Sequence, residues 1–153
     1  MIISPNARKR CYCGNFGCFD TLCSANVLDV LTDGNLAEFF RIKQGGNKEA
    51  VKIWDKYLDH LALAVHNIRM LFDTKVILGG YVGPYVTEDF GKLFPRIDRL
   101  DPYGQKAEDY VIPCCSKIES IAVGSARIFI DEFLKTISSE KMLNQDEQSA
   151  CNA

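Results

Sequence analysis

The run Cys11-Tyr-Cys-Gly-Asn-Phe-Gly-Cys18-Phe-Asp20 decides how the first part of this chain folds. It places three thiols within eight residues, with Gly14 and Gly17 between them. Thiolates bind Zn²⁺ strongly, and a structural zinc site takes four ligands arranged as a tetrahedron. The glycines allow a backbone tight enough to turn the three sulfurs toward one point. The run therefore predicts a zinc loop at residues 11–18, with the ligands Cys11, Cys13 and Cys18.

Two other interpretations of these cysteines stay open. They would be ordinary packing residues if the loop held no metal, although small apolar cysteines rarely cluster in this way. A disulfide is disfavoured, because cysteines two residues apart seldom reach disulfide geometry without strain. The whole chain has seven cysteines, an odd number, and no secretion signal. This pattern favours a reducing compartment, and we expect a cytoplasmic protein.

Length and composition are those of one ordinary globular domain. The chain has 153 residues, of which 47% are hydrophobic and 25% are charged, which is typical of a water-soluble fold. No apolar run is long enough to span a membrane. The net charge of −2 lacks the basic signature of a nucleic-acid binder, and the basic stretch Arg8-Lys9-Arg10 is interpreted as a solvated loop.

Apolar periodicity predicts a helix-rich α/β fold. Asp20 or Thr21 suits the N-cap of the first helix, and Asn35 and Asn47 suit the N-caps of the next two. A kink or an end is expected at Pro95. The expected helices cover about 20–32, 36–45, 48–72, 84–98 and 121–137, the expected strands cover 75–78 and 110–115, and a polar tail covers 140–153.

The pair Gly79-Gly80 follows the first predicted strand, which we expect to be buried. In α/β sheets ligands gather at the carboxyl ends of strands, and bare backbone lets a ligand come close; the alternative is a simple turn. Cys114 and Cys115 are adjacent and would face opposite sides of a strand, so they are interpreted as packing residues. His60 and His66 are six residues apart on one helix, which makes them a poor metal pair.

Three motifs resemble the ROK family of bacterial sugar kinases and sugar-sensing transcriptional repressors. The run from Cys11 to Asp20 is similar to the family's cysteine motif, with Phe19 and Asp20 in place of its usual Leu-Glu. Phe72-Asp-Thr-Lys-Val-Ile-Leu-Gly-Gly80 is similar to a family strand and turn. Ile121-Ala-Val-Gly-Ser-Ala126 is similar to a helix near the family's C-terminus.

The resemblance implies a fold and a domain organisation. Residues 1–139 would form part of the C-terminal lobe of an actin-like, ribonuclease-H-like ATPase fold, with an incomplete sheet, and 140–153 a flexible tail. The family's phosphate loop, catalytic Asp and zinc-binding His lie upstream of the cysteine motif, and none matches this sequence. We therefore expect a piece of a longer protein that performs no catalysis alone, in which the fourth zinc ligand is missing. An exposed sheet edge would favour self-association.

The resemblance also assigns roles to individual residues. Asp20 matches a family Glu that holds sugar hydroxyls; its other interpretation is the helix N-cap. Gly79 and Gly80 would lie beside the adenine and ribose of ATP if the parent protein is a kinase. Tyr81 stands where the kinases carry a third glycine, which favours a regulator.

Three functions remain in competition. The preferred one is the effector-sensing and oligomerisation domain of a sugar-responsive ROK-type regulator. Its partners would be a sugar or sugar-phosphate effector, a second copy of the chain, and DNA through an upstream domain. The second is a piece of a ROK sugar kinase, which would use ATP. The third is a zinc-stabilised oligomerisation module without a ligand.

Overall fold

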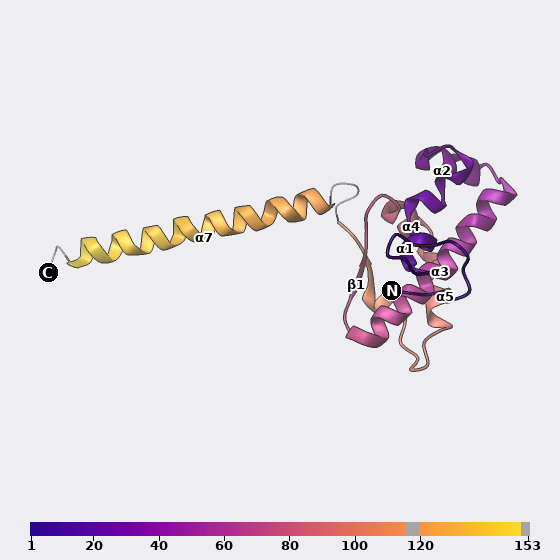
Figure 1. Cartoon of the computed structure of the whole chain (residues 1–153). Helices are drawn as coiled ribbons and strands as arrows, with labels where there is room; N and C mark the ends of the chain where they lie inside the picture. The colour runs from indigo at the N-terminus through magenta and orange to yellow at the C-terminus, as the bar shows by residue number, and fades with distance from the viewer. Residues whose placement is uncertain (116–119, 151–153) are drawn as a thin grey trace.

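A computed structural model describes the backbone of residues 1–115 and 120–150, and the side chains of residues 1–115 and 122–137. Helix α3 runs through the middle of a compact body, and α7 extends away from that body (Figure 1). The helices are α1 (Phe19–Cys23), α2 (Leu36–Gln44), α3 (Lys48–Phe72), α4 (Gly83–Glu88), α5 (Phe90–Asp98), α6 (Ala107–Tyr110) and α7 (Ser120–Ala150), and the strands are β1 (Val76–Leu78) and β2 (Val111–Pro113).

Helix α3 has the bounds that the sequence predicts. The Asn47 side chain caps it by accepting hydrogen bonds from the backbone N–H groups of Glu49 and Ala50, each at 3.0 Å. Its 25 residues make a rod of about 37 Å. Asp73 ends the helix in the left-handed conformation, with φ 41°. The Asn35 side chain caps α2 in the same way, through the backbone N–H of Glu38, so both predicted caps are confirmed.

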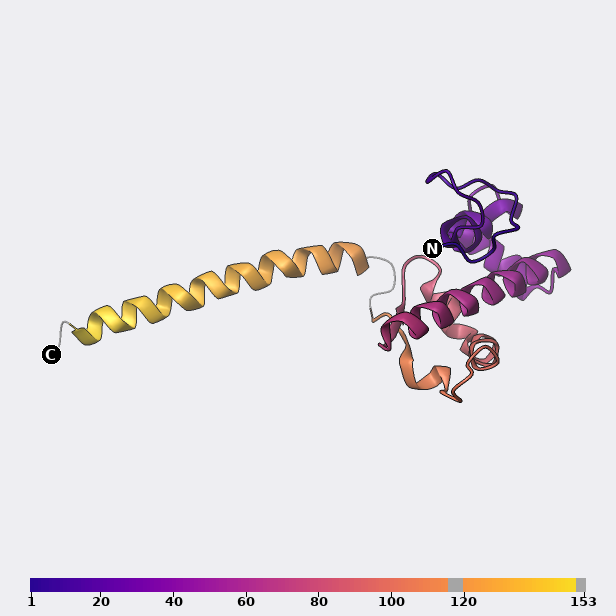
Figure 2. The ribbon, with the colours of Figure 1, turned by 60° about the horizontal axis from the view of Figure 1, so that its bottom comes forward.

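The core lies along α3, where α1, α2 and α5 pack against it. Figure 2 shows these shorter elements grouped around α3. Aromatic rings dominate the contact with α2: Phe40 meets Trp54 edge-on at 5.0 Å and stacks on Tyr85 at 3.6 Å between ring centroids. The largest fully buried side chains are those of Trp54, Phe39, Leu28, Leu58, Leu93, Ile97 and Val65.

The two strands pair in parallel, with Val76 opposite Val111 and Ile77 opposite Ile112. Parallel strands need a crossover connection, and α4, α5 and α6 supply it. The expectation that β1 is a fully buried strand is wrong. Val76 is buried, but Ile77 is 63% exposed, because alternate side chains of a strand face opposite sides and only one side meets the core.

The single helix expected over 20–32 is also wrong. The chain forms α1, then two short 3₁₀ turns at Ala25–Val27 and Asp29–Leu31. Ser24 breaks the helix with an extended backbone (φ −78°, ψ 161°). The apolar residues that were expected on one helix therefore belong to shorter elements. Leu28, between the two 3₁₀ turns, is fully buried.

The helix expected over 84–98 divides into α4 and α5 at Asp89. Asp89 has φ −105° and ψ 21°, outside helical geometry. The helix does not end at Pro95, one of the two outcomes expected there, because α5 continues to Asp98 with Pro95 inside it.

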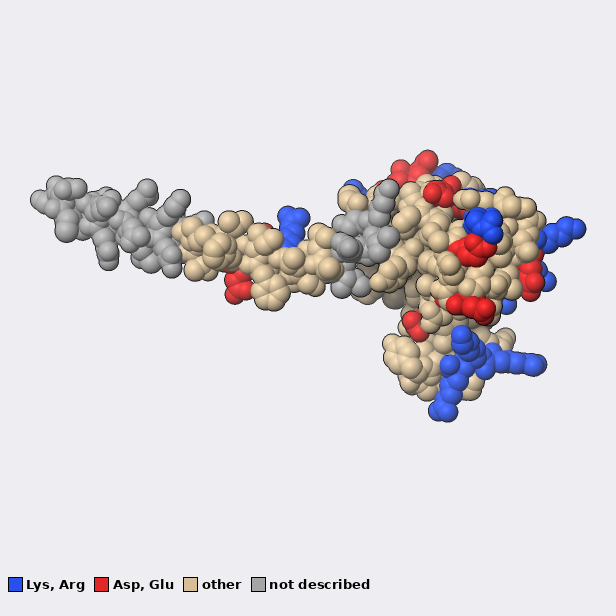
Figure 3. Space-filling view, turned by 90° about the horizontal axis from the view of Figure 1, so that it is seen from above, with Lys and Arg blue, Asp and Glu red and all other residues tan. Residues whose placement is uncertain are grey.

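Helix α7 continues past residue 137, and its backbone remains helical through Ala150, where a polar tail was expected from residue 140. The expected loop at 116–119 and Cys151 lie outside the described residues. In the described part of the chain, no helix combines the length and the apolarity needed to cross a bilayer. Figure 3 shows charges of both signs over the body and few along the coloured part of α7.

Candidate functional site

The cysteine loop (residues 11–18) is shaped by its backbone before any metal is considered. The N–H of Cys11 donates to the carbonyl of Asn15 at 2.8 Å, and the N–H of Gly14 donates to the carbonyl of Cys11 at 2.9 Å. Gly14 and Gly17 both adopt positive φ, 88° and 68°, which glycine reaches without steric cost. The loop therefore closes on itself within a few residues.

Gly17 is also the point where the loop meets the start of the chain. Its carbonyl accepts from the N–H groups of Ile3 (2.9 Å) and Ser4 (3.2 Å). A Cβ at position 17 would lie 1.7 Å from the Ser4 carbonyl oxygen, which no side chain permits. Position 17 thus requires glycine for two independent reasons, the backbone angle and the close approach.

The three sulfurs converge as the sequence predicts. The ligand atoms of Cys11, Cys13 and Cys18 all lie within 4.8 Å of one another, and the sulfurs of Cys13 and Cys18 are 3.5 Å apart. Tetrahedral zinc with Zn–S bonds of about 2.3 Å needs sulfurs about 3.8 Å apart, so the set fits a thiophilic ion. Cys11 and Cys18 are each 6% exposed, whereas Cys13 is exposed. Among the described residues, these three form the one such group.

The thiols of the loop do not titrate alike. The backbone N–H of Asn15 and the Cys18 thiol donate toward Cys13 and lower its pKa to about 7. The hydrogen bond with Cys13, together with burial, raises the pKa of Cys18 to about 11. Of this pair, Cys13 is therefore the thiol that ionises first. A metal ion would have to displace the remaining protons, which makes binding pH-dependent.

Asp20 lies in the first turn of α1 and is exposed. Its interpretation as a helix N-cap is wrong, and so is that of Thr21: the N-cap position belongs to Cys18, with no side-chain capping bond. The Thr21 hydroxyl instead donates back to the carbonyl of Cys18 at 2.8 Å. The cysteine loop thus runs directly into the helix that carries Asp20.

A second candidate site lies where the two strands end. A cavity of about 250 Å³ is lined by Leu78, Gly79, Gly83, Pro84, Thr87, Glu88, Pro113 and Cys114. The N–H of Cys114 donates to the carbonyl of Leu78 at 2.9 Å and joins the strand ends. Gly79 lines the cavity, whereas Gly80, with φ 75°, makes the turn beside it. Tyr81 is 67% exposed and is not among the lining residues.

Sequence reasoning missed Cys114 as a lining residue. It is half-buried at the cavity, against Gly79, whereas Cys115 is exposed, so the interpretation as a packing residue is wrong for Cys115. A Cβ at Gly79 would lie 2.8 Å from the Cβ of Cys114, which explains why a glycine stands there. The sequence contained a signal for this contact, because Gly79 and Cys114 each directly follow a strand, and parallel strands end at the same edge of a sheet.

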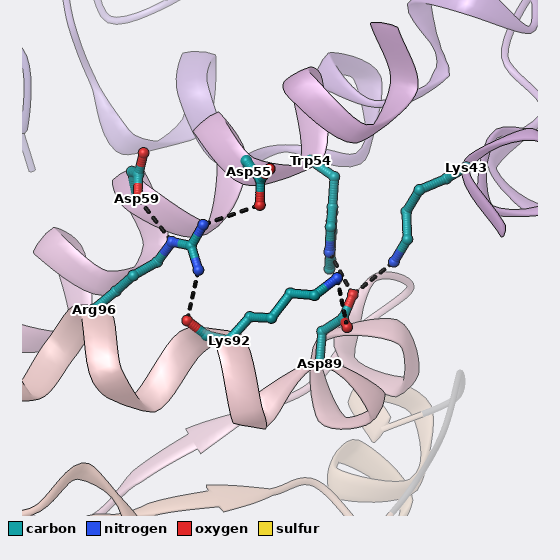
Figure 4. A network of polar contacts seen from close by, with 7 residues as sticks. All are labelled: Lys43, Trp54, Asp55, Asp59, Asp89, Lys92 and Arg96. Atoms are coloured by element: carbon teal, nitrogen blue, oxygen red, sulfur yellow. Dashed lines mark hydrogen bonds and ion pairs between the residues drawn. The ribbon is translucent and has the colours of Figure 1, made fainter. Parts of the chain in front are cut away.

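A polar network is centred on Asp89, which directly follows α4, a helix that lines the cavity (Figure 4). Asp89 Oδ2 accepts from Lys43 Nζ and from Trp54 Nε1, both at 2.6 Å, and Lys92 lies 3.3 Å from the other oxygen. Burial alone would raise the pKa of Asp89, but the hydrogen bonds from Lys43 and Trp54 outweigh it and lower the pKa. The network ties α2 and α3 to the junction between α4 and α5.

The same face carries a second tie between α3 and α5. Arg96 donates to Asp55 at 2.9 Å and to Asp59 at 2.8 Å (Figure 4). These contacts hold α5 along α3, and α5 follows directly from the helix that lines the cavity. Two of the charged residues of α3, Asp55 and Asp59, therefore bind another helix.

Comparison with known proteins gives two findings. The model of the ROK family matches residues 1–97. N-acetyl-D-glucosamine kinase of Pectobacterium atrosepticum is 31% identical over 80 residues, which cover 48% of this chain and 26% of the relative. The chain thus spans about a quarter of the length of the curated relative that it matches.

The family match covers more than half of the chain and includes both the cysteine loop and the Gly79-Gly80 turn. The chain belongs to the ROK family. The resemblance of the cysteine motif and of the run from Phe72 to Gly80 is thereby confirmed, whereas the motif at residues 121–126 lies outside the matched residues. The helix-rich α/β body with its small parallel sheet is compatible with that family's fold.

Proposed function

We propose that this chain supplies the nucleotide-facing part of a ROK sugar kinase. One observation carries the proposal: the cavity at the strand ends stays open, because the side chain of Tyr81, at the position of the third glycine, is 67% exposed and does not line the cavity. The kinase that matches part of the chain supports the same choice. This reverses the preference for a regulator that the sequence alone gave.

The adenine end of ATP fits the chemistry of the cavity. Its walls combine the bare backbone of Gly79 and Gly83 with the apolar surface of Leu78 and Pro113. A flat heteroaromatic ring packs against such surfaces. The Thr87 hydroxyl donates to the carbonyl of Gly83 and so can accept a hydrogen bond from a ligand. Gly80 would shape the turn without touching the base.

We also propose that the cysteine loop holds Zn²⁺ through Cys11, Cys13 and Cys18, with a fourth ligand from outside this cluster. In that arrangement the ion would order the loop and the start of α1, and so place Asp20. Asp20 would accept hydrogen bonds from two neighbouring sugar hydroxyls. The zinc would therefore position the sugar-binding carboxylate and take no part in the phosphoryl transfer.

The regulator remains the second candidate, because Gly79-Gly80-Tyr81-Val82-Gly83 departs from the three glycines typical of the kinases. In that protein the chain would sense a sugar or sugar phosphate near Asp20, act as a homo-oligomer in the cytoplasm, and reach DNA only through another domain. The exposed side of β1 at Ile77 supports self-association in either case.

Amide NMR of the labelled chain with ADP tests the kinase proposal. Shifts should concentrate on residues 78–88 and 113–114 and weaken in Gly79→Ala, whose new Cβ would press on Cys114. Gly91→Ala is the matched control, because a Cβ at Gly91 meets open space. Sugar-induced shifts near Asp20 without any ADP response at the cavity would favour the regulator instead.

A further inference from the structure

One pair of thiols in the cysteine loop, that of Cys13 and Cys18, lies within hydrogen-bonding distance. The sulfurs of Cys13 and Cys18 are 3.5 Å apart, and both are free thiols. A disulfide bond is about 2.05 Å long, so an approach of about 1.5 Å would join them. The turn at Gly14 and the bonds from Ile3 and Ser4 to Gly17 hold the two thiols at this separation.

Exposure also distinguishes this pair. Cys13 is exposed, whereas Cys11 and Cys18 are each 6% exposed. A pair made of Cys11 and Cys18 would be closed to a dissolved oxidant. A pair made of Cys11 and Cys13, two residues apart, would be strained. The pair of Cys13 and Cys18 alone combines an open thiol with a shielded partner five residues away.

We propose that Cys13 and Cys18 form a dithiol that hydrogen peroxide oxidises to a disulfide, and that this modification competes with metal binding at the cluster. The second half rests on the metal site proposed above; the first half does not. The Cys13 sulfur attacks a peroxide oxygen, the O–O bond breaks, and Cys13 becomes a sulfenic acid as one water leaves.

The Cys18 sulfur then attacks the Cys13 sulfur, the S–O bond breaks, and the hydroxide leaves as a second water with the proton of the Cys18 thiol. In sum two thiols lose two electrons and two protons, and one peroxide becomes two waters. The disulfide removes two of the three thiolates, so an ion held by all three is released. Reduction by a small-molecule thiol restores the site.

Peptide mapping of the full chain tests the disulfide. Metal-free protein is treated with limiting hydrogen peroxide, free thiols are blocked with N-ethylmaleimide, and the protein is digested with chymotrypsin. Cleavage after Tyr12, Phe16 and Phe19 separates the three cysteines. We expect Cys13–Phe16 joined to Gly17–Phe19 and blocked Cys11. Cys18→Ser should abolish the joined peptide and leave Cys13 over-oxidised, and Cys115→Ser should change nothing.

A joined peptide that contains Cys11, or oxidation of Cys115 ahead of Cys13, would overturn the assignment. The release of zinc is measured with zinc-loaded protein and a chromogenic zinc chelator. Zinc should appear in step with the disulfide and should be taken up again after reduction. Disulfide formation with the zinc retained would refute the competition. Failure of the protein to take up zinc at all would refute the proposed metal site and leave the disulfide result standing.

Discussion

The cysteine loop and the helical body (α2–α5, residues 36–98) are held together in different ways. The loop depends on backbone hydrogen bonds, two left-handed glycines and three convergent thiols. The helical body depends on buried apolar side chains, chief among them Trp54, Phe39 and Leu58. The first kind of structure is sensitive to backbone geometry and ligand chemistry, and the second to side-chain volume.

The largest expected effect lies in the helical body. Trp54→Ala leaves a cavity beside Phe40 and removes the indole bond to Asp89, and we expect the free energy of unfolding to fall by about 3–5 kcal/mol. Urea titration followed by circular dichroism measures this loss. Val51→Ala, at a half-exposed position of the same helix, is the control and should change little. Equal losses in the two variants would contradict a core centred on Trp54.

The next largest effect is expected in the cysteine loop alone. Gly17→Ala must leave the left-handed conformation and separate from the Ser4 carbonyl, so we expect loss of metal binding with little change in the urea transition of the helical body. Zinc stoichiometry by atomic emission measures it. In Gly14→Ala the nearest atom to the new Cβ is an Arg10 nitrogen at 3.8 Å, so that variant should retain more zinc. Full zinc content in Gly17→Ala would contradict the claim that the cysteine loop is sensitive to backbone geometry.

Sequence reasoning succeeded where the cause is local. The caps at Asn35 and Asn47 and the full extent of α3 follow from side chains within a few residues of each helix end. The cysteine cluster follows from close spacing and two glycines. Sequence reasoning failed where residues far apart in the sequence determine the local structure. The break at Asp89 reflects its ion pair with Lys43, 46 residues away, and no periodicity within 84–98 contains that information.

The two candidate sites differ in the same way, because one is formed by a short run of residues and the other by segments far apart in the sequence. Cys11, Cys13 and Cys18 belong to one short run, so their convergence was predictable. The strand-end cavity is assembled from two strands and α4, and only Gly79 of its lining was singled out. The exposure of Tyr81 depends on how the turn leaves β1, and the sequence fixes only its position after Gly80.

A smaller loss of stability is expected when the charge at the centre of the polar network, on Asp89, is removed. Asp89→Asn keeps the shape but removes the charge that Lys43 and Trp54 bind, and we expect a loss of about 2 kcal/mol near neutral pH. The folded pKa of Asp89 is lowered. Its contribution is therefore complete above the pKa of an unfolded aspartate, about 3.9, and disappears as the pH falls through the folded value.

Melting temperatures of the wild type and of Asp89→Asn, measured from neutral to acidic pH, check this. The two curves should converge in acid. A constant gap across the whole range would mean that shape, and not charge, explains the role of Asp89.

The smallest effect is expected at an exposed ion pair of α2. Arg41 binds Glu38 in a two-pronged contact at 2.6 and 2.7 Å, which lowers the pKa of Glu38. Both side chains are open to solvent, where such pairs contribute little. Arg41→Ala should leave the melting temperature unchanged within error. A clear decrease would show that the stability of the helical body depends on more than its buried side chains.

Trp54 is the one tryptophan in the sequence. It is 1% exposed, stacks on Tyr57 at 5.3 Å and donates its indole N–H to Asp89. Its fluorescence should therefore be blue-shifted in the folded chain and shift to the red when the helical body opens. Because the cysteine loop contains no tryptophan, this emission reports on the helical body alone. The absorbance of a thiolate-bound cobalt ion, as a stand-in for zinc, would report on the loop in the same cuvette.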